Sequence, residues 1–114
     1  MCFLLHYIII IISLYYFLMN NIRFEWDQNK NRDNIKKHKV SFEEAKTIFY
    51  DDNARLISDP EHSDYEERFI ILGISYSLRI LVVVHTYRED DEVIRIISAR
   101  KATKSEIKYY YEVK

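Results

Sequence analysis

The sequence predicts an α+β fold: one small antiparallel sheet of about four strands, with two helices before it and one after it. Two observations predict this class. Apolar runs between residues 54 and 102 are separated only by short polar stretches, which is typical of consecutive antiparallel strands. Helix-start signals lie on both sides of these runs. The length of 114 residues suits a single domain of this kind.

Residues 1–18 form an apolar segment that differs in composition from the rest. Of residues 1–19, 17 are apolar or aromatic and none carries a formal charge. The segment is just long enough to cross a bilayer as a helix, and it lacks the basic start and cleavage site of a signal peptide. Two interpretations stay open: a membrane anchor that leaves the domain on the cytoplasmic side, or a start assigned too early, with Met19 as the true first residue. We favour the second, and in both cases expect a cytoplasmic domain over residues 19–114.

The first predicted helix has an unusually polar inner face. It follows a short strand at residues 22–26, and Asp27 fits its N-cap. Such a face is expected to pack on polar groups or to line a site. The residues at inward helical spacing are Asn31, Asn34, Ile35 and His38.

The second predicted helix begins with a capping box formed by Ser41 and Glu44. Val40 and Ala45 supply the matching hydrophobic staple. Its buried stripe is expected to consist of Phe42, Ala45, Ile48 and Phe49.

Four strands are then predicted at residues 54–58, 68–75, 79–87 and 93–102. Gly73, the only glycine, is expected at a bulge or at a close approach of two backbones. Thr103 and Glu106 form a second capping box that begins the closing helix. The apolar face of this helix is expected to consist of Ile107, Tyr110 and Tyr111.

Charge is segregated along the chain although the net charge is only −1. Residues 49–92 contain 4 basic and 11 acidic residues, whereas residues 93–114 contain 6 basic and 2 acidic ones. A basic face for an anionic partner is therefore possible, and so is simple pairing of the acidic middle with the basic ends. Cys2 is the single cysteine, and no cluster of cysteine and histidine has zinc-ligand spacing. Neither a metal nor a cofactor is expected.

Three blocks of sequence resemble one known family. They are FEWDQNKNRDNIKKHKVSFEEA at residues 24–45, DPEHSDYEERFIILG at residues 59–73, and IRIISARKATKSE at residues 94–106. In this order they resemble the BrnT family of type II toxins, over about residues 19–112. The resemblance implies a RelE-like fold and a ribonuclease that blocks translation. It also implies a ribbon-helix-helix antitoxin, BrnA, which neutralises the toxin and contacts the operator DNA on behalf of the complex.

A metal-free ribonuclease needs cations for the charge on the phosphate and a base for the ribose 2′-OH. Arginine meets phosphate oxygens with two parallel donors. Arg100 is the first candidate, because it lies just before a helix N-terminus, which also favours anions. Arg68 and Arg95 are further candidates, and neutralisation by the nearby Asp64, Glu66 and Glu67 is the alternative for Arg68. Strict alternation places Arg95 and Arg100 on opposite faces unless a bulge intervenes, so a structural ion pair is an equal alternative for Arg95.

Two histidines are candidate bases, since histidine titrates near neutral pH. His38 ends the first helix, where the helix dipole favours its protonated form, and His62 lies in the acidic loop. His85 lies in an apolar run and is expected to be structural. Additional contacts to RNA are expected from Lys37, Lys101 and Trp26, with core packing as the alternative for Trp26.

Two classes of function remain open from the sequence. The first is an endoribonuclease toxin that attacks the phosphate through the 2′-OH and leaves a 2′,3′-cyclic phosphate. The second is a non-catalytic module that binds RNA or protein, tethered to a membrane if residues 1–18 form an anchor.

Overall fold

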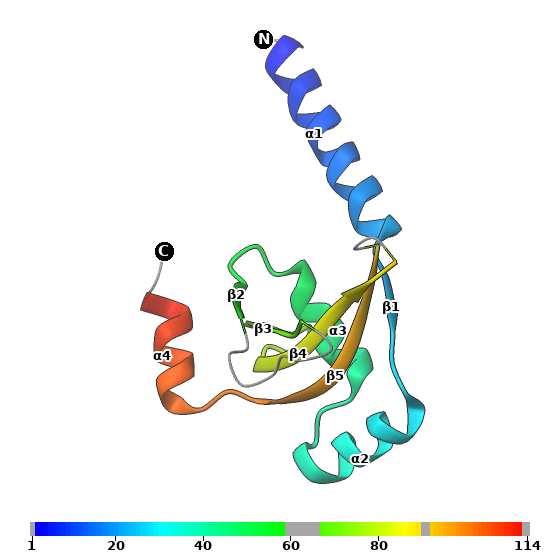
Figure 1. Ribbon diagram of the computed structural model, residues 1–114. Coiled ribbons are helices and arrows are strands. Elements are labelled where there is room, and N and C mark those ends of the chain that lie inside the picture. Colours follow the sequence, from blue (N-terminus) through cyan, green and yellow to red (C-terminus); the bar gives the residue numbers. More distant parts are fainter. Residues whose placement is uncertain (1, 59–66, 90–91, 113–114) are drawn as a thin grey trace.

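The computed structural model describes residues 2–58, 67–89 and 92–112 (Figure 1). It is an α+β fold, as the sequence predicts. The elements in order are α1 (Cys2–Asn21), β1 (Arg23–Glu25), α2 (Gln28–His38), α3 (Phe42–Lys46), the 3-10 helix η1 (Thr47–Tyr50), β2 (Arg55–Ser58), β3 (Phe69–Ile74), β4 (Ile80–Arg88), β5 (Val93–Lys101) and α4 (Lys104–Glu112).

The described strands form one mixed sheet in the order β1-β5-β4-β3-β2. Strands β2 to β5 are consecutive and antiparallel. The short strand expected at residues 22–26 is β1. It forms a fifth strand at the edge of the sheet and runs parallel to β5, which corrects the expectation of about four antiparallel strands. No hairpin joins these two strands, since the rest of the domain lies between them in sequence, so their direction is not limited to antiparallel.

One face of the sheet is covered by α3 and η1, which bury the stripe that the sequence predicts. Their side chains meet those of β3, β4 and β5 in the main core, and Gly73 lies where η1 approaches β3. A Cβ atom at Gly73 would lie 3.1 Å from the Cβ of Ile48, so the expected close approach is confirmed. The buried members of this core are Val40, Phe42, Ala45, Ile48, Ile71, Leu81, Val83, Ile96 and Ala99.

The capping box of α3 is only half formed. The Ser41 Oγ accepts a hydrogen bond from the Glu44 backbone N–H at 3.0 Å, as expected. The Glu44 carboxylate, however, binds Arg79 at 2.9 Å from Nε and Ser75 at 2.6 Å from Oγ. The hydrogen bond from Arg79 is the main reason why the pKa of Glu44 falls to about 2. This carboxylate therefore ties α3 to the turn between β3 and β4.

The polar inner face of α2 packs on backbone groups, as the sequence indicates. Asn34 is buried, and its amide donates to the carbonyls of Val40 and Ala99, both at 2.8 Å. Its Oδ1 accepts from the Ala99 N–H at 3.1 Å. Strand β1 ends opposite Arg95, so it does not reach the later residues of β5. Asn34 gives Ala99 of β5 the two hydrogen bonds that a neighbouring strand would otherwise supply.

The opposite face of the sheet is covered in part by α4. Tyr110 is buried against Leu72 and Val82, and its hydroxyl donates to Asp51 Oδ2 at 2.5 Å. The expected apolar face of α4 is buried only at Tyr110, because Ile107 is 36% exposed and Tyr111 is 59% exposed. Tyr110 is the single buried residue of this helix, so α4 leaves part of the sheet face open.

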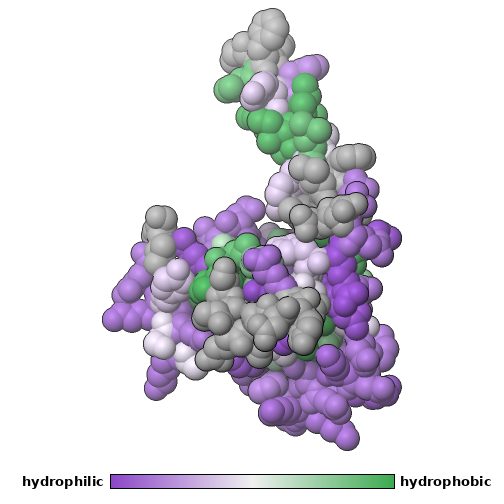
Figure 2. Space-filling view, viewed as in Figure 1, coloured by the Kyte–Doolittle hydropathy of each residue, from purple (hydrophilic) through white to green (hydrophobic). Residues whose placement is uncertain are grey.

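Helix α1 projects away from the sheet (Figure 1). Its described aliphatic side chains are exposed and give the upper end of the molecule its apolar surface (Figure 2). The Tyr15 hydroxyl donates to Asp52 Oδ1 at 3.3 Å. Within the described parts of the chain, no helix combines the length and the apolarity needed to cross a bilayer.

Candidate functional site

A β-bulge in β5 determines where the candidate arginines lie. Val84 pairs with Ser98, whereas the next residue of β4, His85, pairs with Ile96. Ile97 is therefore an extra residue in β5, and side chains on its two sides are no longer related by strict alternation.

The bulge places Arg95 and Arg100 on the same face of the sheet. Arg95 pairs with Thr86 and Arg100 with Val82. Residues 82 and 86 are four apart on β4, so they share a face. The opposite faces that strict alternation gives therefore do not occur, because the bulge that the sequence left open as an exception is present. The shared face is the one that α4 covers in part, since Val82 contacts Tyr110 there.

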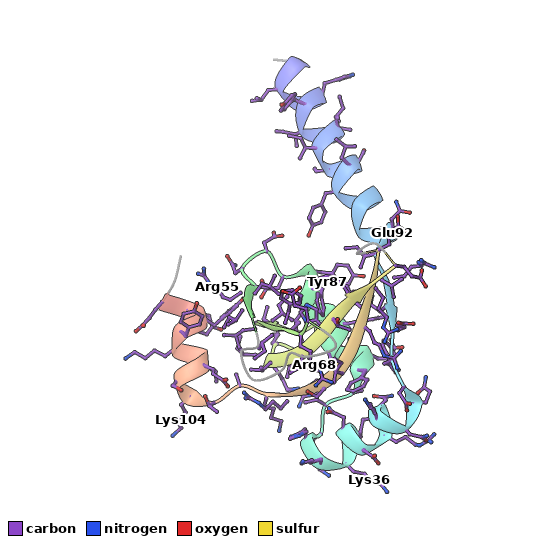
Figure 3. The ribbon with its side chains drawn as sticks, in the orientation of Figure 1. Lys36, Arg55, Arg68, Tyr87, Glu92 and Lys104 are labelled. Carbon is purple, nitrogen blue, oxygen red and sulfur yellow. The ribbon has the colours of Figure 1, made fainter. Side chains whose placement is uncertain are left out.

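Arg68 extends this face toward β3. It precedes Phe69, the first residue of that strand, and lies two positions before Ile70, which packs on the α4 side, so continued alternation places Arg68 on that side as well. Figure 3 shows Arg68 near the middle of the molecule, whereas Lys36 and Lys104 lie at its periphery. The Thr86 hydroxyl donates to the Glu67 carbonyl at 2.8 Å and fixes the backbone beside Arg68. Of the three carboxylates named as alternative partners of Arg68, those at positions 64 and 66 lie outside the described residues.

Arg100 is held by a carboxylate that the sequence did not assign to it. Glu106 of α4 accepts two hydrogen bonds from the guanidinium, at 2.8 and 2.9 Å. Glu106 also completes the capping box, because it accepts from the Thr103 N–H at 2.8 Å. The hydrogen bonds with Arg100 are the main cause of a pKa of about 2 for Glu106, and they raise the pKa of Arg100. The alternative to phosphate binding was an ion pair with the acidic residues 49–92, whereas this carboxylate belongs to the basic end of the chain.

Arg95 takes part in a looser ion pair. Its Nη1 lies 3.5 Å from Oε1 of Glu25, the residue opposite it on β1. The same carboxylate oxygen lies 3.6 Å from Nε of Arg88. Two arginines thus share one carboxylate at this end of the face. Neither Glu25 nor Glu106 was predicted to lie here, although the capping-box motif had identified Glu106.

The histidines lie in different environments. His85 has no exposed surface and packs against Phe49, Phe69 and Tyr87. Burial lowers its pKa to about 4, which agrees with the expected structural role. His38 ends α2 and is half-buried. His62 lies outside the described residues.

The remaining candidates lie away from the bulge. Lys37 of α2 and Lys101 of β5 are exposed. Trp26 is half-buried, and its ring meets the ring of Phe42 edge-on with centroids 6.1 Å apart, which fits the core alternative. In the described residues, no group of His, Cys, Asp and Glu could hold a metal ion.

The similarity of this chain to known proteins agrees with the resemblance seen in its motifs. The family model described as "Ribonuclease toxin, BrnT, of type II toxin-antitoxin system" matches residues 26–106. The chain belongs to the BrnT family. BrnT proteins are ribonuclease toxins whose systems include an antitoxin, and an antitoxin is accordingly a partner of this chain.

A solved BrnT structure has a similar fold. It is the 1.1 Å crystal structure of the Brucella abortus ribonuclease toxin BrnT. That toxin and this chain are 25% identical in sequence, and their structures superpose with a TM-score of 0.55. The similarity covers 73% of this chain and 99% of that one. No curated protein matches the chain.

Proposed function

We propose that this chain is a metal-independent endoribonuclease that blocks translation by cutting RNA in the cytoplasm. The observation that supports this function best is the common face of Arg68, Arg95 and Arg100, produced by the bulge at Ile97. We further propose that a ribbon-helix-helix antitoxin of the BrnA kind neutralises it and carries the contacts to operator DNA.

In the proposed reaction, a base removes the proton of a ribose 2′-OH and the oxygen attacks the adjacent phosphorus. The bond to the 5′-oxygen breaks, this oxygen takes up a proton, and a 2′,3′-cyclic phosphate remains. The arginines stabilise the negative charge on the phosphate oxygens. His38 and His62 are the proposed bases, and Lys37, Lys101 and Trp26 the proposed additional contacts to RNA.

Arg100 needs an exchange of partners for this role. Its two hydrogen bonds to the Glu106 carboxylate have the geometry with which a guanidinium binds two phosphate oxygens. A phosphate would therefore replace Glu106 rather than occupy an open site. Arg95 needs less rearrangement, because its contact with Glu25 is 3.5 Å long.

The test is cleavage of a single-stranded RNA by the purified full-length chain in EDTA, with product ends identified by mass spectrometry. We expect 2′,3′-cyclic phosphate ends, and a loss of at least tenfold in kcat/KM for Arg95→Ala and for Arg100→Ala, given that removal of one charge-stabilising donor costs about 10²–10³ in rate. Lys46→Ala is the matched control, because Lys46 belongs to α3 on the opposite face. Circular dichroism checks that each variant is folded.

Two outcomes would contradict the proposal. RNA binding without cleavage, at any concentration of EDTA or Mg²⁺, would identify a non-catalytic RNA-binding module. Cleavage that Lys46→Ala impairs as strongly as Arg95→Ala would place the site elsewhere.

A further inference from the structure

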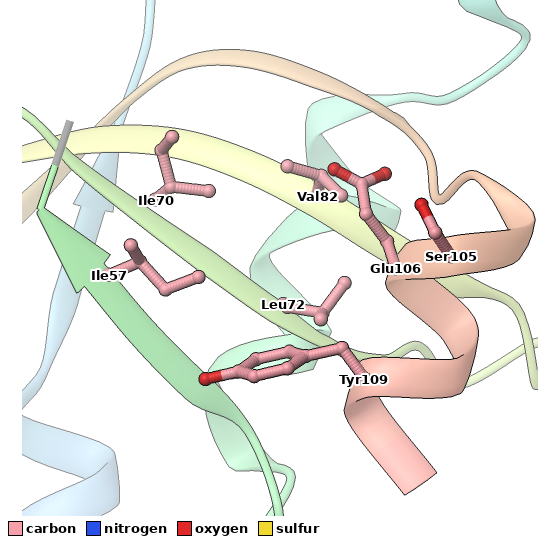
Figure 4. A pocket seen from close by; sticks show the side chains of 7 residues that line it. All are labelled: Ile57, Ile70, Leu72, Val82, Ser105, Glu106 and Tyr109. Atoms are coloured by element: carbon pink, nitrogen blue, oxygen red, sulfur yellow. The ribbon is translucent and has the colours of Figure 1, made fainter. Parts of the chain in front are cut away.

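An apolar pocket lies on the same sheet face as the arginines, between the sheet and α4 (Figure 4). Its volume is about 320 Å³, twice the roughly 150 Å³ that holds a benzene ring in a protein core. It can therefore accept one large or two medium apolar side chains. The sheet supplies Ile57, Ile70, Leu72 and Val82, and α4 supplies Glu106 and Tyr109.

The exposure of the pocket walls indicates a surface that a partner covers. Ile57 is 42% exposed and Tyr109 is also 42% exposed. Ile57 belongs to β2, an edge strand of four residues that pairs with β3 on one side. Large apolar side chains around a concave pocket are typical of a binding site rather than of an isolated surface residue.

A charged group beside the pocket defines the chemistry of the partner. Arg55 lies two residues before Ile57 on β2 and so faces the same side of the sheet, opposite Leu72. Figure 3 shows it on the side of β2 toward α4. Its Nε atom is buried and, among the described residues, has no hydrogen-bond acceptor. A buried donor without an acceptor is costly, and a carboxylate from a partner would satisfy it.

The position of the pocket identifies which partner would bind there. Glu106 lines the pocket and also holds Arg100, and Val82 lies both in the pocket and opposite Arg100. A protein segment bound in the pocket would therefore lie beside the arginine face and exclude RNA from it. Exclusion of RNA from the arginine face is an effect by which an antitoxin would neutralise a ribonuclease.

We propose that the pocket is a docking site for the antitoxin, through a segment that inserts apolar side chains and directs a carboxylate to Arg55. This inference rests on the proposed function only for its choice of partner. The interaction would combine an apolar anchor in a concave site with a charge-assisted hydrogen bond at its edge.

The test measures binding of the purified full-length chain to the antitoxin encoded with it, by calorimetry. We expect Ile57→Glu and Arg55→Gln each to weaken binding at least tenfold. Leu56→Glu is the matched control: Leu56 is an exposed residue of the same strand, 56% accessible, but it pairs with Ile71 and faces the opposite side. RNA cleavage without antitoxin is measured in parallel and should stay within twofold for all three variants.

The outcomes separate this inference from the proposed ribonuclease activity. Unchanged affinity of Ile57→Glu, or an equal loss for Leu56→Glu, would overturn the docking site whatever the activity. If the wild-type chain cuts no RNA while Ile57→Glu and Arg55→Gln still weaken binding selectively, the docking site stands and the ribonuclease proposal fails.

Discussion

At the scale of single residues, His85 shows how burial fixes a protonation state. The side chain has no exposed surface, and its aromatic neighbours offer little stabilisation to a charge. The hydroxyl of Tyr87, 3.3 Å from Nε2, is its one side-chain hydrogen-bond partner among the described residues. The ring is therefore neutral in the folded protein at neutral pH. Protonation either requires unfolding or costs the free energy of burying a charged ring.

We predict that this histidine makes the fold less stable as the pH falls below about 6.5. Its pKa is lowered from 6.5 to about 4 in the folded state, so the unfolded state binds more protons between these values and stability decreases with falling pH. The full effect is roughly 3 kcal/mol at about 1.4 kcal/mol per pKa unit. About 2 kcal/mol of this effect develops between pH 7.5 and pH 5, because pH 5 lies 1.5 units below the unfolded-state pKa. Urea denaturation at these two pH values measures that difference, and His85→Phe should remove most of it.

The carboxylates provide an internal check on this assignment. The folded-state pKa values of Glu44 and Glu106 are lowered from 4.5 to about 2. Their contributions to the free energy of unfolding are fully present above about pH 4.5 and are lost only as the pH falls from there toward 2. A loss of stability between pH 6.5 and 5 that persists in His85→Phe would show that another group causes it.

At the scale of elements, α2 is attached to the sheet by an amide side chain rather than by an apolar stripe. Asn34 makes its hydrogen bonds with Ala99 of β5 and with Val40 in the connection to α3. Ile35, the apolar residue beside it, is 41% exposed. The position of α2 along β5 thus depends on one buried polar group.

We predict that Asn34→Ala destabilises the protein by about 3 kcal/mol, since it leaves buried backbone groups of β5 and of the α2–α3 connection without partners. Asn34→Asp should be at least as harmful, because a carboxylate cannot donate to the two carbonyls. Urea denaturation provides the free energies of unfolding. The control is Asn29→Ala at an exposed position of the same helix, with an expected effect within about 0.5 kcal/mol. Equal effects at both positions would contradict the role given to Asn34.

Local signals explain which elements could be predicted from the sequence. The side chains of Asp27, Ser41 and Thr103 all cap helices as expected, because each cap depends on residues at most three positions away. The pairing of Glu44 with Arg79 joins residues 35 positions apart. The bulge at Ile97 and the parallel pairing of β1 likewise depend on how distant strands align. For this reason the sequence left open whether Arg95 and Arg100 share a face.

At the scale of the whole molecule, the two faces of the sheet have different roles. One face is sealed by α3 and η1 over a continuous core. The other carries Arg68, Arg95 and Arg100 toward one side and the apolar pocket toward α4. The net charge of −1 therefore does not describe the surface that an RNA would meet. Binding to that surface should be strongly dependent on salt.

We predict that the affinity of the full-length chain for single-stranded RNA falls with salt in proportion to the phosphates that this face contacts. For single strands, log K against log[salt] has a slope of about −0.7 for each neutralised phosphate, so three arginine contacts give about −2. Arg68→Ala and Arg95→Ala should each make the slope less steep by about 0.7, whereas Lys46→Ala on the opposite face should leave it unchanged. Fluorescence anisotropy at several KCl concentrations measures these slopes on a single-stranded RNA with 2′-methoxy groups in place of the 2′-OH groups, which the proposed reaction cannot cleave. A slope that Arg95→Ala leaves unaltered would show that Arg95 stays with Glu25 in the complex, because an arginine that keeps its carboxylate neutralises no phosphate.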